Sequence, residues 1–442
     1  MANAIRWTNS SVRAFAGNSP NPVHIMETRV RALVLKAMDQ GWSGPPYDPI
    51  RLAEILGYEI EASEDVKEAR VSLHNNGKFK VEFNPTRPQG RIYFSVAHEI
   101  AHTLFPDCKD RVRHRNVHDH LEQDDWQIEV LCNLGAAELL MPVGSFGELR
   151  NASFSIEELL TRRKDFQVST EALLIRYVKL TDAPCAAFCA SRIDSGRNAG
   201  RYRLDYLIAS KAWIRTLVAG SHFGEGSPVE ECIAIGYTAK GKEVALDKKP
   251  LLVEAVGLAP YPGQVVPRVA GIVYEPSDKN VVTPSINYVR GDALEPRGTE
   301  KKIIAHIIND KTPRWGGAGF ASAVRRRWPD VHRAFLDQVL DSNGEALKLG
   351  ATTSLTVSEK TILFNIVAQH GYGPSPSPRI RYAALRSGLE KLSQKAKESH
   401  ATVHMPRMGT GNAGGSWPVV EEMITEALLS QGISVTVYDL PK

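Results

Sequence analysis

The sequence has few cysteines, little net charge and no long apolar run, and each absence excludes a class of protein. The five cysteines form neither a C-x-x-C pair nor a dense, even set, so we expect no disulfide framework and a reducing compartment. Lys and Arg number 54 against 50 Asp and Glu, and the formal charge of +4 is too small to indicate nucleic acid or a membrane surface as a partner. No segment contains 18 consecutive apolar residues, and the N-terminus has no apolar leader-like stretch. We therefore expect a cytoplasmic protein with no membrane partner.

The length and the changes of pattern along the chain predict three domains. A chain of 442 residues is long for one core, since roughly 150 residues per domain is usual. Residues 1–183 mix helical patterns with a few strand-like runs, and residues 184–283 carry short β-like runs, one of them at 231–239. Residues 284–442 alternate strands with helices, which predicts a largely parallel sheet covered by helices. The expected fold class is multidomain, α+β followed by α/β, with a β-rich middle domain.

Turn residues and capping motifs divide the first domain into elements. Three strands are predicted to form a small sheet, at 69–73, 80–83 and 91–94. Ser155-x-x-Glu158 is a capping box that predicts the start of a helix, and Ser169 is expected to cap the next helix.

The most informative stretch is FSVAHEIAHTLF, residues 94–105, which has the H-E-x-x-H spacing on a segment predicted to be helical. Residues four apart on a helix lie one above the other, so His98 and His102 can offer two imidazole nitrogens to one zinc ion. Glu99, one step round the helix, can reach a water molecule on that metal. A catalytic zinc generally takes a third protein ligand, and the candidate is Glu129 on the predicted helix 129–142. The first hypothesis is therefore a zinc hydrolase.

Three motifs in roughly residues 25–183 resemble those of the ImmA/IrrE family of metallopeptidases. They read D-P-I-R-L-A-E-I-L-G at 48–57, R-x-x-F-S-V-A-H-E-I-A-H at 91–102 and E-x-x-C-N-x-G-A-A-E-L-L-M-P at 129–142. The resemblance implies a zincin-like HExxH domain in which Zn²⁺ is held by His98, His102 and Glu129 while Glu99 acts as general base. The chain departs from the family at Cys132, where Ala is frequent, and at Gly135, where an aromatic residue is frequent. A buried packing thiol is commoner than a thiol ligand, so Cys132 is not assigned to the metal.

Other interpretations of these motifs compete with the zinc site. His98 and His102 can be a hydrogen-bonded pair of helix histidines, and a charged loop offers rival ligands, namely His114, His118, Asp119 and His120. For that loop we prefer a solvated surface. Two amphipathic helices at 155–180 permit a DNA-binding helix-turn-helix, with Arg162, Arg163, Lys164, Arg176 and Lys179 as its basic residues. We favour packing and substrate binding over DNA, because a run of charge is usually a solvated face.

The last domain contains two Gly-rich loops, each between a predicted strand and a predicted helix. The first runs from Asn309 to Phe320 and the second from Met408 to Trp417. Glycines let backbone N–H groups approach a phosphate closely, and the start of a helix adds the positive end of a dipole. A Rossmann interpretation of G-x-G-x-x-G at 409–414 fails, because that motif belongs to the first strand of its fold and only three residues follow Asp439. Tight turns in an unrelated α/β domain remain the alternative.

Residues 284–442 look like a macro domain with an α/β/α architecture, which implies binding of ADP-ribose. The resemblance rests on Gly291-Asp292, on Asn309 after a buried strand and on the two Gly-rich loops. The residues that it assigns to the ligand are Asp292, Asn309, Trp315, Gly316, Gly317, Gly319, Phe320, Gly409, Thr410, Gly411, Asn412 and Gly414. The related glycohydrolases use a Lys and an Asp, where this chain has Gln369 and Ala413. Neither residue can act as nucleophile or acid, although Asp310, His306 or His370 can support another mechanism.

Together these features predict a zinc endopeptidase joined through a β-rich domain to a domain that senses ADP-ribose or a related nucleotide. By analogy with the family, the expected protein substrate is a transcriptional repressor of the helix-turn-helix kind, cleaved in a stress or mobile-element response. Two alternatives stay open. One is an ADP-ribosyl hydrolase whose N-terminal module serves for targeting, and the other is a non-catalytic regulator that binds DNA.

Overall fold

The computed structural model describes residues 7–74, 77–110, 113–114, 124–146, 155–244, 246, 250–260, 266–275, 286–317, 319–373 and 375–440. The chain divides into two compact units. Unit 1 comprises Met1–Val30, Gly44–Pro142 and Glu148–Val281, and unit 2 comprises Arg31–Ser43, Val143–Gly147 and Val282–Lys442. Within the described ranges, no helix is both long enough and apolar enough to cross a membrane.

The first sheet of unit 1 has four strands in the order β1-β3-β2-β4. Their bounds are β1 Glu59–Ala62, β2 Ala69–Leu73, β3 Phe79–Phe83 and β4 Arg113–His114. Strand β2 pairs antiparallel with β3, with Val71 opposite Val81, and both of these valines are fully buried. The strands predicted at 69–73 and 80–83 are therefore present, and helix α4 (Gln89–His102) packs against β2 and β3.

The strand predicted at 91–94 is wrong, because these residues form the first turns of α4. Pro88 immediately precedes the helix, where its fixed φ suits a helix start. Ile92, Tyr93, Val96 and Ile100 then follow one another at helical spacing on the buried side. A short run of apolar and aromatic residues fits either element, and here the longer helical period decides.

Further helices precede or follow the strands of this sheet along the chain. Their bounds are α1 Ser10–Ala16, α2 Pro22–Asp39, α3 Pro49–Ile55, α5 Trp126–Leu140, α6 Ile156–Phe166 and α7 Thr170–Leu180. Both predicted caps are present: the Ser155 hydroxyl accepts from the Glu158 N–H at 3.4 Å, and the Ser169 hydroxyl accepts from the Ala172 N–H at 3.1 Å. Helix α5 packs along α4, and α6 and α7 pack on the second sheet of the unit.

The second sheet of unit 1 is antiparallel throughout, in the order β6-β5-β9-β8-β7. The bounds are β5 Cys185–Arg192, β6 Tyr202–Ala209, β7 Thr238–Glu243, β8 Leu251–Leu258 and β9 Arg268–Tyr274, with the short helix α8 at Pro228–Glu231. The strand predicted at 231–239 is wrong over most of its length, since β7 begins only at Thr238. Gly236 has a φ of +84°, which breaks any extended run before it.

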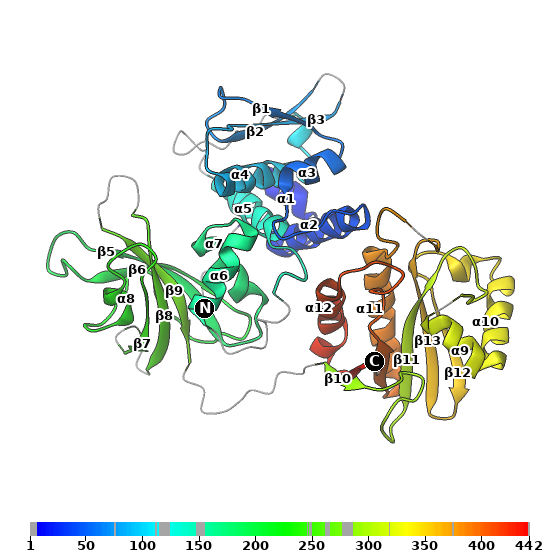
Figure 1. Ribbon diagram of the computed structural model, residues 1–442. Coiled ribbons are helices and arrows are strands. Elements are labelled where there is room, and N and C mark those ends of the chain that lie inside the picture. The colour runs from blue at the N-terminus through cyan, green and yellow to red at the C-terminus, as the bar shows by residue number, and fades with distance from the viewer. Residues whose placement is uncertain are drawn as a thin grey trace. The chain divides into compact units, whose positions relative to one another are not determined.

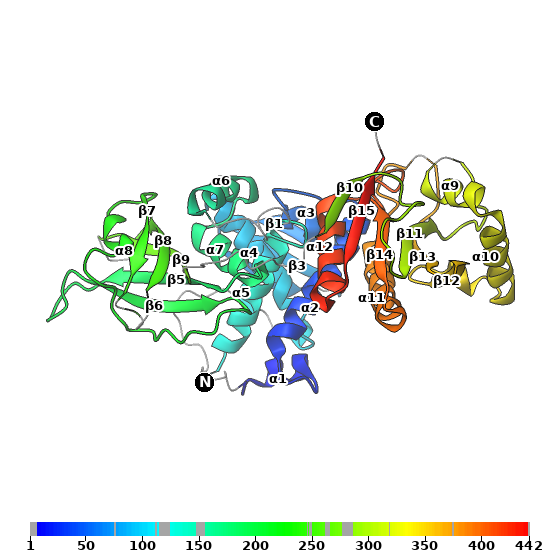
Figure 2. The same cartoon turned by 90° about the horizontal axis from the view of Figure 1, so that it is seen from below.

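Unit 2 contains a six-stranded sheet in the order β10-β15-β14-β11-β13-β12, parallel except for the edge strand β12. Its strands are β10 Asn287–Arg290, β11 Lys302–Asn309, β12 Thr352–Ser358, β13 Thr361–Gln369, β14 Thr402–Pro406 and β15 Val435–Asp439. Its helices are α9 Phe320–Arg327, α10 Pro329–Asp341, α11 Tyr382–Ser399 and α12 Trp417–Ala427. Helices α11 and α12 cover one face and α9 and α10 the other (Figures 1 and 2). The mixed fold class expected from the sequence, including the α/β/α layering, is confirmed.

Candidate functional site

Helix α4 carries the H-E-x-x-H motif on its buried face. His98, Glu99 and His102 are 1%, 0% and 1% exposed, respectively. Because residues four apart lie one above the other on a helix, the two imidazoles come together, with their Nε2 atoms 3.1 Å apart. Helix α5 runs along α4 and supplies the remaining groups of the site.

The Glu129 carboxylate, in the first turn of α5, lies beside both imidazole Nε2 atoms. Its oxygens are 3.0 Å from His98 Nε2 and 3.5 Å from His102 Nε2. Zinc–ligand bonds of 2.0–2.1 Å in tetrahedral geometry place neighbouring ligand atoms about 3.3 Å apart. The three separations, 3.0, 3.1 and 3.5 Å, bracket that value. The donor set therefore fits a zinc ion held by His98, His102 and Glu129.

The other ring nitrogen of each histidine contacts a neighbouring residue of α5. His98 Nδ1 lies 3.0 Å from Asn133 Oδ1, and His102 Nδ1 lies 3.3 Å from Cys132 Sγ. With Nδ1 engaged in this way, the Nε2 lone pair of each ring is directed toward the Glu129 side. Asn133 was not identified from the sequence, because nothing in the motif shows which residue of α5 meets His98.

Cys132 is the alternative third ligand. His98, His102 and Cys132 have ligand atoms within 4.8 Å of one another. The thiol, however, lies against Nδ1 of His102, on the opposite side of the ring from Nε2. An ion held by both Nε2 atoms lies on the Glu129 side of that ring, so the geometry favours Glu129 as ligand and Cys132 as a hydrogen-bond partner of His102.

The Glu99 carboxylate is fully buried and is oriented by strand β2. Its Oε2 accepts a hydrogen bond of 3.0 Å from the backbone N–H of Val71. A general base must be held within reach of the water that it deprotonates, and this bond fixes the carboxylate next to the histidines. The sequence motif names Glu99, but the strand that orients it becomes apparent only in the folded structure.

Most of the rival ligands lie outside the described residues, whereas one basic residue of the DNA-binding alternative is described and buried. His118, Asp119 and His120 lie outside the described residues, and of His114 only the backbone, in β4, is described. Arg176 forms a buried ion pair with Glu138 and donates to the Met141 carbonyl at 2.9 Å, so it is unavailable to a phosphate. This burial agrees with the preference for packing over DNA binding.

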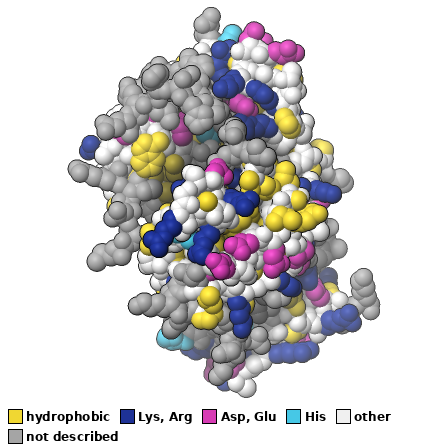
Figure 3. Space-filling model, turned by 90° about the vertical axis from the view of Figure 1, so that its left-hand side faces the viewer, with side chains coloured by type: hydrophobic (Ala, Val, Ile, Leu, Met, Phe, Trp, Pro, Cys, Tyr) yellow, Lys and Arg dark blue, Asp and Glu magenta, His cyan; other side chains and the backbone are white. Residues whose placement is uncertain are grey.

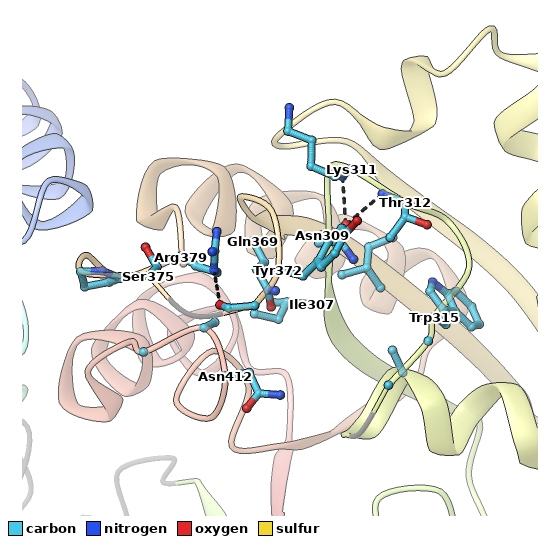
Figure 4. A pocket seen from close by; sticks show the side chains of 18 of the residues that line it. Ile307, Asn309, Lys311, Thr312, Trp315, Gln369, Tyr372, Ser375, Arg379 and Asn412 are labelled. Carbon is cyan, nitrogen blue, oxygen red and sulfur yellow. Dashed lines mark hydrogen bonds between the residues drawn. The ribbon is translucent and has the colours of Figure 1, made fainter.

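Unit 2 has a cleft of about 1410 Å³ at the carboxyl end of strand β11 (Figure 4). Six of the residues predicted to bind ADP-ribose line it: Asn309, Trp315, Gly316, Gly317, Asn412 and Gly414. The other six do not line it: Asp292, Gly319, Phe320, Gly409, Thr410 and Gly411. Both Gly-rich loops therefore reach the same cavity, one on each side.

The first Gly-rich loop is shaped by hydrogen bonds and by a buried anchor. Asn309 Oδ1 accepts from the backbone N–H groups of Lys311 and Thr312, both at 2.9 Å (Figure 4). Trp315 has a φ of +43° and is 2% exposed, with its indole stacked on Phe335 at 4.7 Å between ring centroids. Trp315 thus holds the loop against helix α10 and offers little surface to a ligand.

The second loop depends on glycine at two positions. Gly409 has a φ of +80°, and a Cβ there would lie 2.5 Å from the Ile380 side chain. Gly415 packs so closely that a Cβ added there would lie 2.6 Å from the Gly409 carbonyl oxygen.

Asp292 lies outside both Gly-rich loops, and its carboxylate accepts from the Leu294 N–H at 2.9 Å.

Residues 372–373 and 375–379, which the sequence analysis did not assign to the site, form another wall of the cleft. Tyr372, Gly373, Ser375 and Arg379 line the cavity. The Arg379 guanidinium closes this segment by donating to the Gly373 carbonyl at 2.8 Å (Figure 4). It also donates to the His370 carbonyl at 3.1 Å. The wall is therefore a preformed loop.

The Asp310 carboxylate ties this loop to the first Gly-rich loop. It accepts from His370 Nδ1 at 2.8 Å and from the Gly371 N–H at 2.9 Å. Burial raises the pKa of Asp310, but the hydrogen bonds from Gly371 and His370 outweigh it, and the pKa lies below its usual value. His306, one of the other groups considered for catalysis, is buried within the sheet, and burial lowers its pKa to about 4.

Gln369 and Ala413, which the resemblance to macro domains sets at the places of the glycohydrolase Lys and Asp, are otherwise engaged or inert. The Gln369 side-chain amide donates to the Gly371 carbonyl at 2.8 Å, and Ala413 is 3% exposed with its carbonyl bonded to the N–H groups of Arg379 and Ile380. These contacts support loop structure and offer no acid or nucleophile.

Comparison with known proteins agrees with the resemblance of the first part of the chain to the IrrE family and finds further relatives. Residues 66–177 match the family model of the IrrE N-terminal-like domain. The radiation response metalloprotease IrrE of Deinococcus deserti is 35% identical over 133 residues, which is 28% of this chain and 45% of that protein. The chromodomain-helicase-DNA-binding protein 1-like of Mus musculus is 32% identical over 181 residues, 39% of this chain and 19% of that protein. A macrodomain protein from Streptomyces coelicolor, of known structure, is 39% identical, with 35% of this chain and 99% of that chain covered and a TM-score of 0.31. The chain thus spans less than half the length of either of these two curated relatives.

Proposed function

We propose that the chain, whose residues 66–177 match the family model of the IrrE N-terminal-like domain, is a zinc-dependent endopeptidase with a macro-like domain that binds ADP-ribose or a related nucleotide. The proposed division is a peptidase domain at 1–183, a β-rich middle domain at 184–283 and the macro-like domain at 284–442. The substrate that we propose is a transcriptional repressor of the helix-turn-helix kind, cleaved in a stress or mobile-element response.

The observation that carries the peptidase proposal is the meeting of two imidazole Nε2 atoms and one carboxylate beside a buried glutamate. The Nε2 atoms of His98 and His102 and the oxygens of Glu129 are 3.0–3.5 Å apart. A zinc ion bound there supplies Lewis acidity and lowers the pKa of a bound water. Glu99 accepts the proton of the attacking water and can deliver it to the leaving amine, and the Val71 N–H holds its carboxylate in place.

The test of this part separates metal binding from catalysis. We expect one zinc per chain in the purified protein by elemental analysis, and a reduced zinc content in Glu129→Gln. Glu99→Gln should keep zinc but lose cleavage of the repressor, read as new N-termini by mass spectrometry, because it removes only the base. Full zinc content in the double variant His98→Ala and His102→Ala would show that the ion is held elsewhere.

The nucleotide part rests on the shared cleft of the two Gly-rich loops. We expect calorimetric titration of ADP-ribose into the full chain to show one-to-one binding that Gly317→Glu abolishes, because Gly317 lines the cleft. Gly344→Glu is the matched control: both glycines have positive φ and an open surrounding, but Gly344 does not line the cavity. No heat with the wild-type chain would contradict this part and leave the peptidase part standing.

The hydrolase alternative receives less support from the site. The amide of Gln369 and the methyl group of Ala413 occupy the places of the glycohydrolase Lys and Asp. Release of ADP-ribose from a modified protein, lost on Asn309→Ala and kept on Glu99→Gln, would overturn our preference.

A further inference from the structure

A second cleft, of about 900 Å³, lies within unit 1, between helices α6 and α7 and the middle sheet. Its helix side is formed by Leu160, Arg163 and Lys164, and its sheet side by Ile235, Val256 and Leu258. Helix α6 is fixed to the sheet by the Ile156 N–H, which donates to the Glu254 carboxylate at 2.8 Å. The cleft is therefore built from packed elements and is separate from the H-E-x-x-H residues.

Exposed apolar side chains gather at the sheet side of this cleft. Ile233, Ile235 and Tyr237 are 68%, 64% and 58% exposed. They occupy alternate positions in the turn that leads into β7. Figure 3, which views the chain from its left-hand side in Figure 1, shows hydrophobic side chains beside Lys and Arg side chains. Ile235 is the one of these three residues that lines the cleft, and neighbouring exposed apolar residues mark an interaction site more often than single ones do.

The two carboxylates that line the cleft are hydrogen-bonded or paired, whereas two of its positive charges have no carboxylate partner among the described residues. The Glu157 carboxylate accepts from the Thr238 hydroxyl at 3.0 Å, and Glu171 forms an ion pair with Arg268 at 3.3 Å. Arg163 donates to the Thr170 hydroxyl at 3.3 Å. Among the described residues, no carboxylate lies within ion-pair distance of Arg163 or Lys164. The cleft thus presents two positive charges next to an apolar surface.

We propose that this cleft holds an acidic segment with apolar side chains, belonging to the protein that the peptidase cleaves and lying away from the cleaved bond. The inference rests on the proposed endopeptidase function and adds a docking site to it. Acidic side chains of the segment pair with Arg163 and Lys164, and apolar ones cover Ile235 and its neighbours.

A peptide fits this surface better than a DNA duplex does. The lining is partly apolar, and the backbone of a DNA duplex offers phosphates but no apolar side chain to cover Ile235. Arg176, one of the basic residues of the helix-turn-helix alternative, is buried against Glu138.

The test uses the full chain with Glu99→Gln, so that a bound peptide is not cut. The probe is a fluorescein-labelled nonapeptide of alternating Glu and Leu, and its partner is the same peptide with Lys in place of Glu. By fluorescence anisotropy, we expect the acidic peptide to bind about tenfold more tightly or better. The double change Arg163→Glu with Lys164→Glu should weaken it by about tenfold or more, and Ile235→Asp should weaken it as well.

Matched controls separate the cleft from the general surface. Lys179→Glu changes an exposed lysine of α7 outside the cleft, and Ile214→Asp changes an apolar residue that is 87% exposed elsewhere in the middle domain. Neither should alter binding. Equal affinity for the two peptides, or no effect of the double change, would overturn the docking site.

Failure of the docking site can be told apart from failure of the proposed function. If the double variant, with Glu99 intact, cleaves the repressor as well as the wild type does, the peptidase stands and the docking site falls. If the acidic peptide binds but no repressor is cleaved, the cleft stands as a peptide site and the endopeptidase proposal falls. Binding of a DNA duplex that the double change abolishes would assign these positive charges to nucleic acid and overturn the inference.

Discussion

At the scale of single residues, the proposed metal site depends on two side chains that contact its histidines on the side away from Glu129. Asn133 Oδ1 and Cys132 Sγ contact the Nδ1 atoms of His98 and His102 at 3.0 and 3.3 Å. Such contacts fix the tautomer and the rotation of a metal-binding imidazole, and losing one typically costs 10–100-fold in affinity. A thiol in this place is a weaker partner than a carboxylate or an amide.

The first prediction concerns these two contacts. We expect Asn133→Ala and Cys132→Ala each to lower zinc affinity by about tenfold or more, measured by competition with a chromophoric chelator. Cys185→Ala is the control, because it removes another buried thiol, in the middle sheet. If zinc affinity is unchanged in Asn133→Ala, the orientation of His98 is set by the fold of α4 alone.

A second prediction at this scale concerns His306, which is fully buried in β11 beside Trp315 and Phe320. Burial lowers its folded pKa from 6.5 to about 4, so the unfolded chain binds the proton more readily between these values. Its neutral form therefore contributes stability that is complete above pH 6.5 and is lost as the pH falls toward 4. At pH 5 the loss is about 2 kcal/mol.

The measurement is urea unfolding of the full chain at pH 7 and pH 5, followed by tryptophan fluorescence. We expect a smaller drop in midpoint between the two pH values for His306→Leu than for the wild type. His404, whose pKa burial also lowers to about 4, is retained in the variant and keeps part of the pH dependence. Equal drops in the two proteins would show that His306 does not titrate on unfolding in this range.

At the scale of elements, the close approach of α4 and α5 depends on Gly135. A Cβ at this position would lie 2.9 Å from the Ala101 Cβ and 3.3 Å from the Met26 sulfur. Ala101 precedes the proposed ligand His102, and α5 carries Glu129, so the glycine sets the spacing on which the proposed metal site depends. A side chain larger than glycine does not fit here unless the two helices move apart.

We therefore predict that Gly135→Ala weakens zinc binding and lowers thermal stability. Alanine gains about 1 kcal/mol in helix propensity, but the Ala101 methyl cannot move without its helix, so the clash outweighs the gain. The control is Gly388→Ala in α11, where the new Cβ would lie 2.2 Å from Ile366 within unit 2. That variant should destabilise the chain and leave zinc affinity unchanged. Unchanged zinc affinity in Gly135→Ala would contradict the prediction.

The elements also show how far sequence reasoning reaches. The alternation of strands and helices expected over 284–442 is present in β11, β13 and α11, and the H-E-x-x-H segment is helical as its motif predicts. The error at 91–94 arose because a short apolar run suits both periods. The partner of His98 and the Arg379-closed wall of the cleft depend on contacts between distant segments, which no local pattern contains. For the same reason the sequence did not predict that Trp315, which lines the cleft, would have its ring stacked on Phe335.

At the scale of the whole molecule, the proposal places ADP-ribose binding and peptide cleavage in one chain. ADP-ribose can regulate cleavage only if it binds two states of the chain with different affinities. Coupling is reciprocal for binding: if ADP-ribose changes the affinity for the repressor by some factor, the repressor changes the affinity for ADP-ribose by the same factor. Typical couplings amount to about 5–150-fold.

We expect a sensor of this kind to show that reciprocity. The chain with Glu99→Gln binds without cleaving, so calorimetry can measure ADP-ribose affinity with and without saturating repressor, and repressor affinity with and without ADP-ribose. The two ratios should agree and should be about fivefold or more. Gly317→Glu removes the nucleotide and should leave repressor affinity at its nucleotide-free value, while Gly344→Glu should behave as the wild type does. Two ratios near one would mean that the two parts act independently, and the macro-like domain would then serve to bring the peptidase to ADP-ribose-bearing targets.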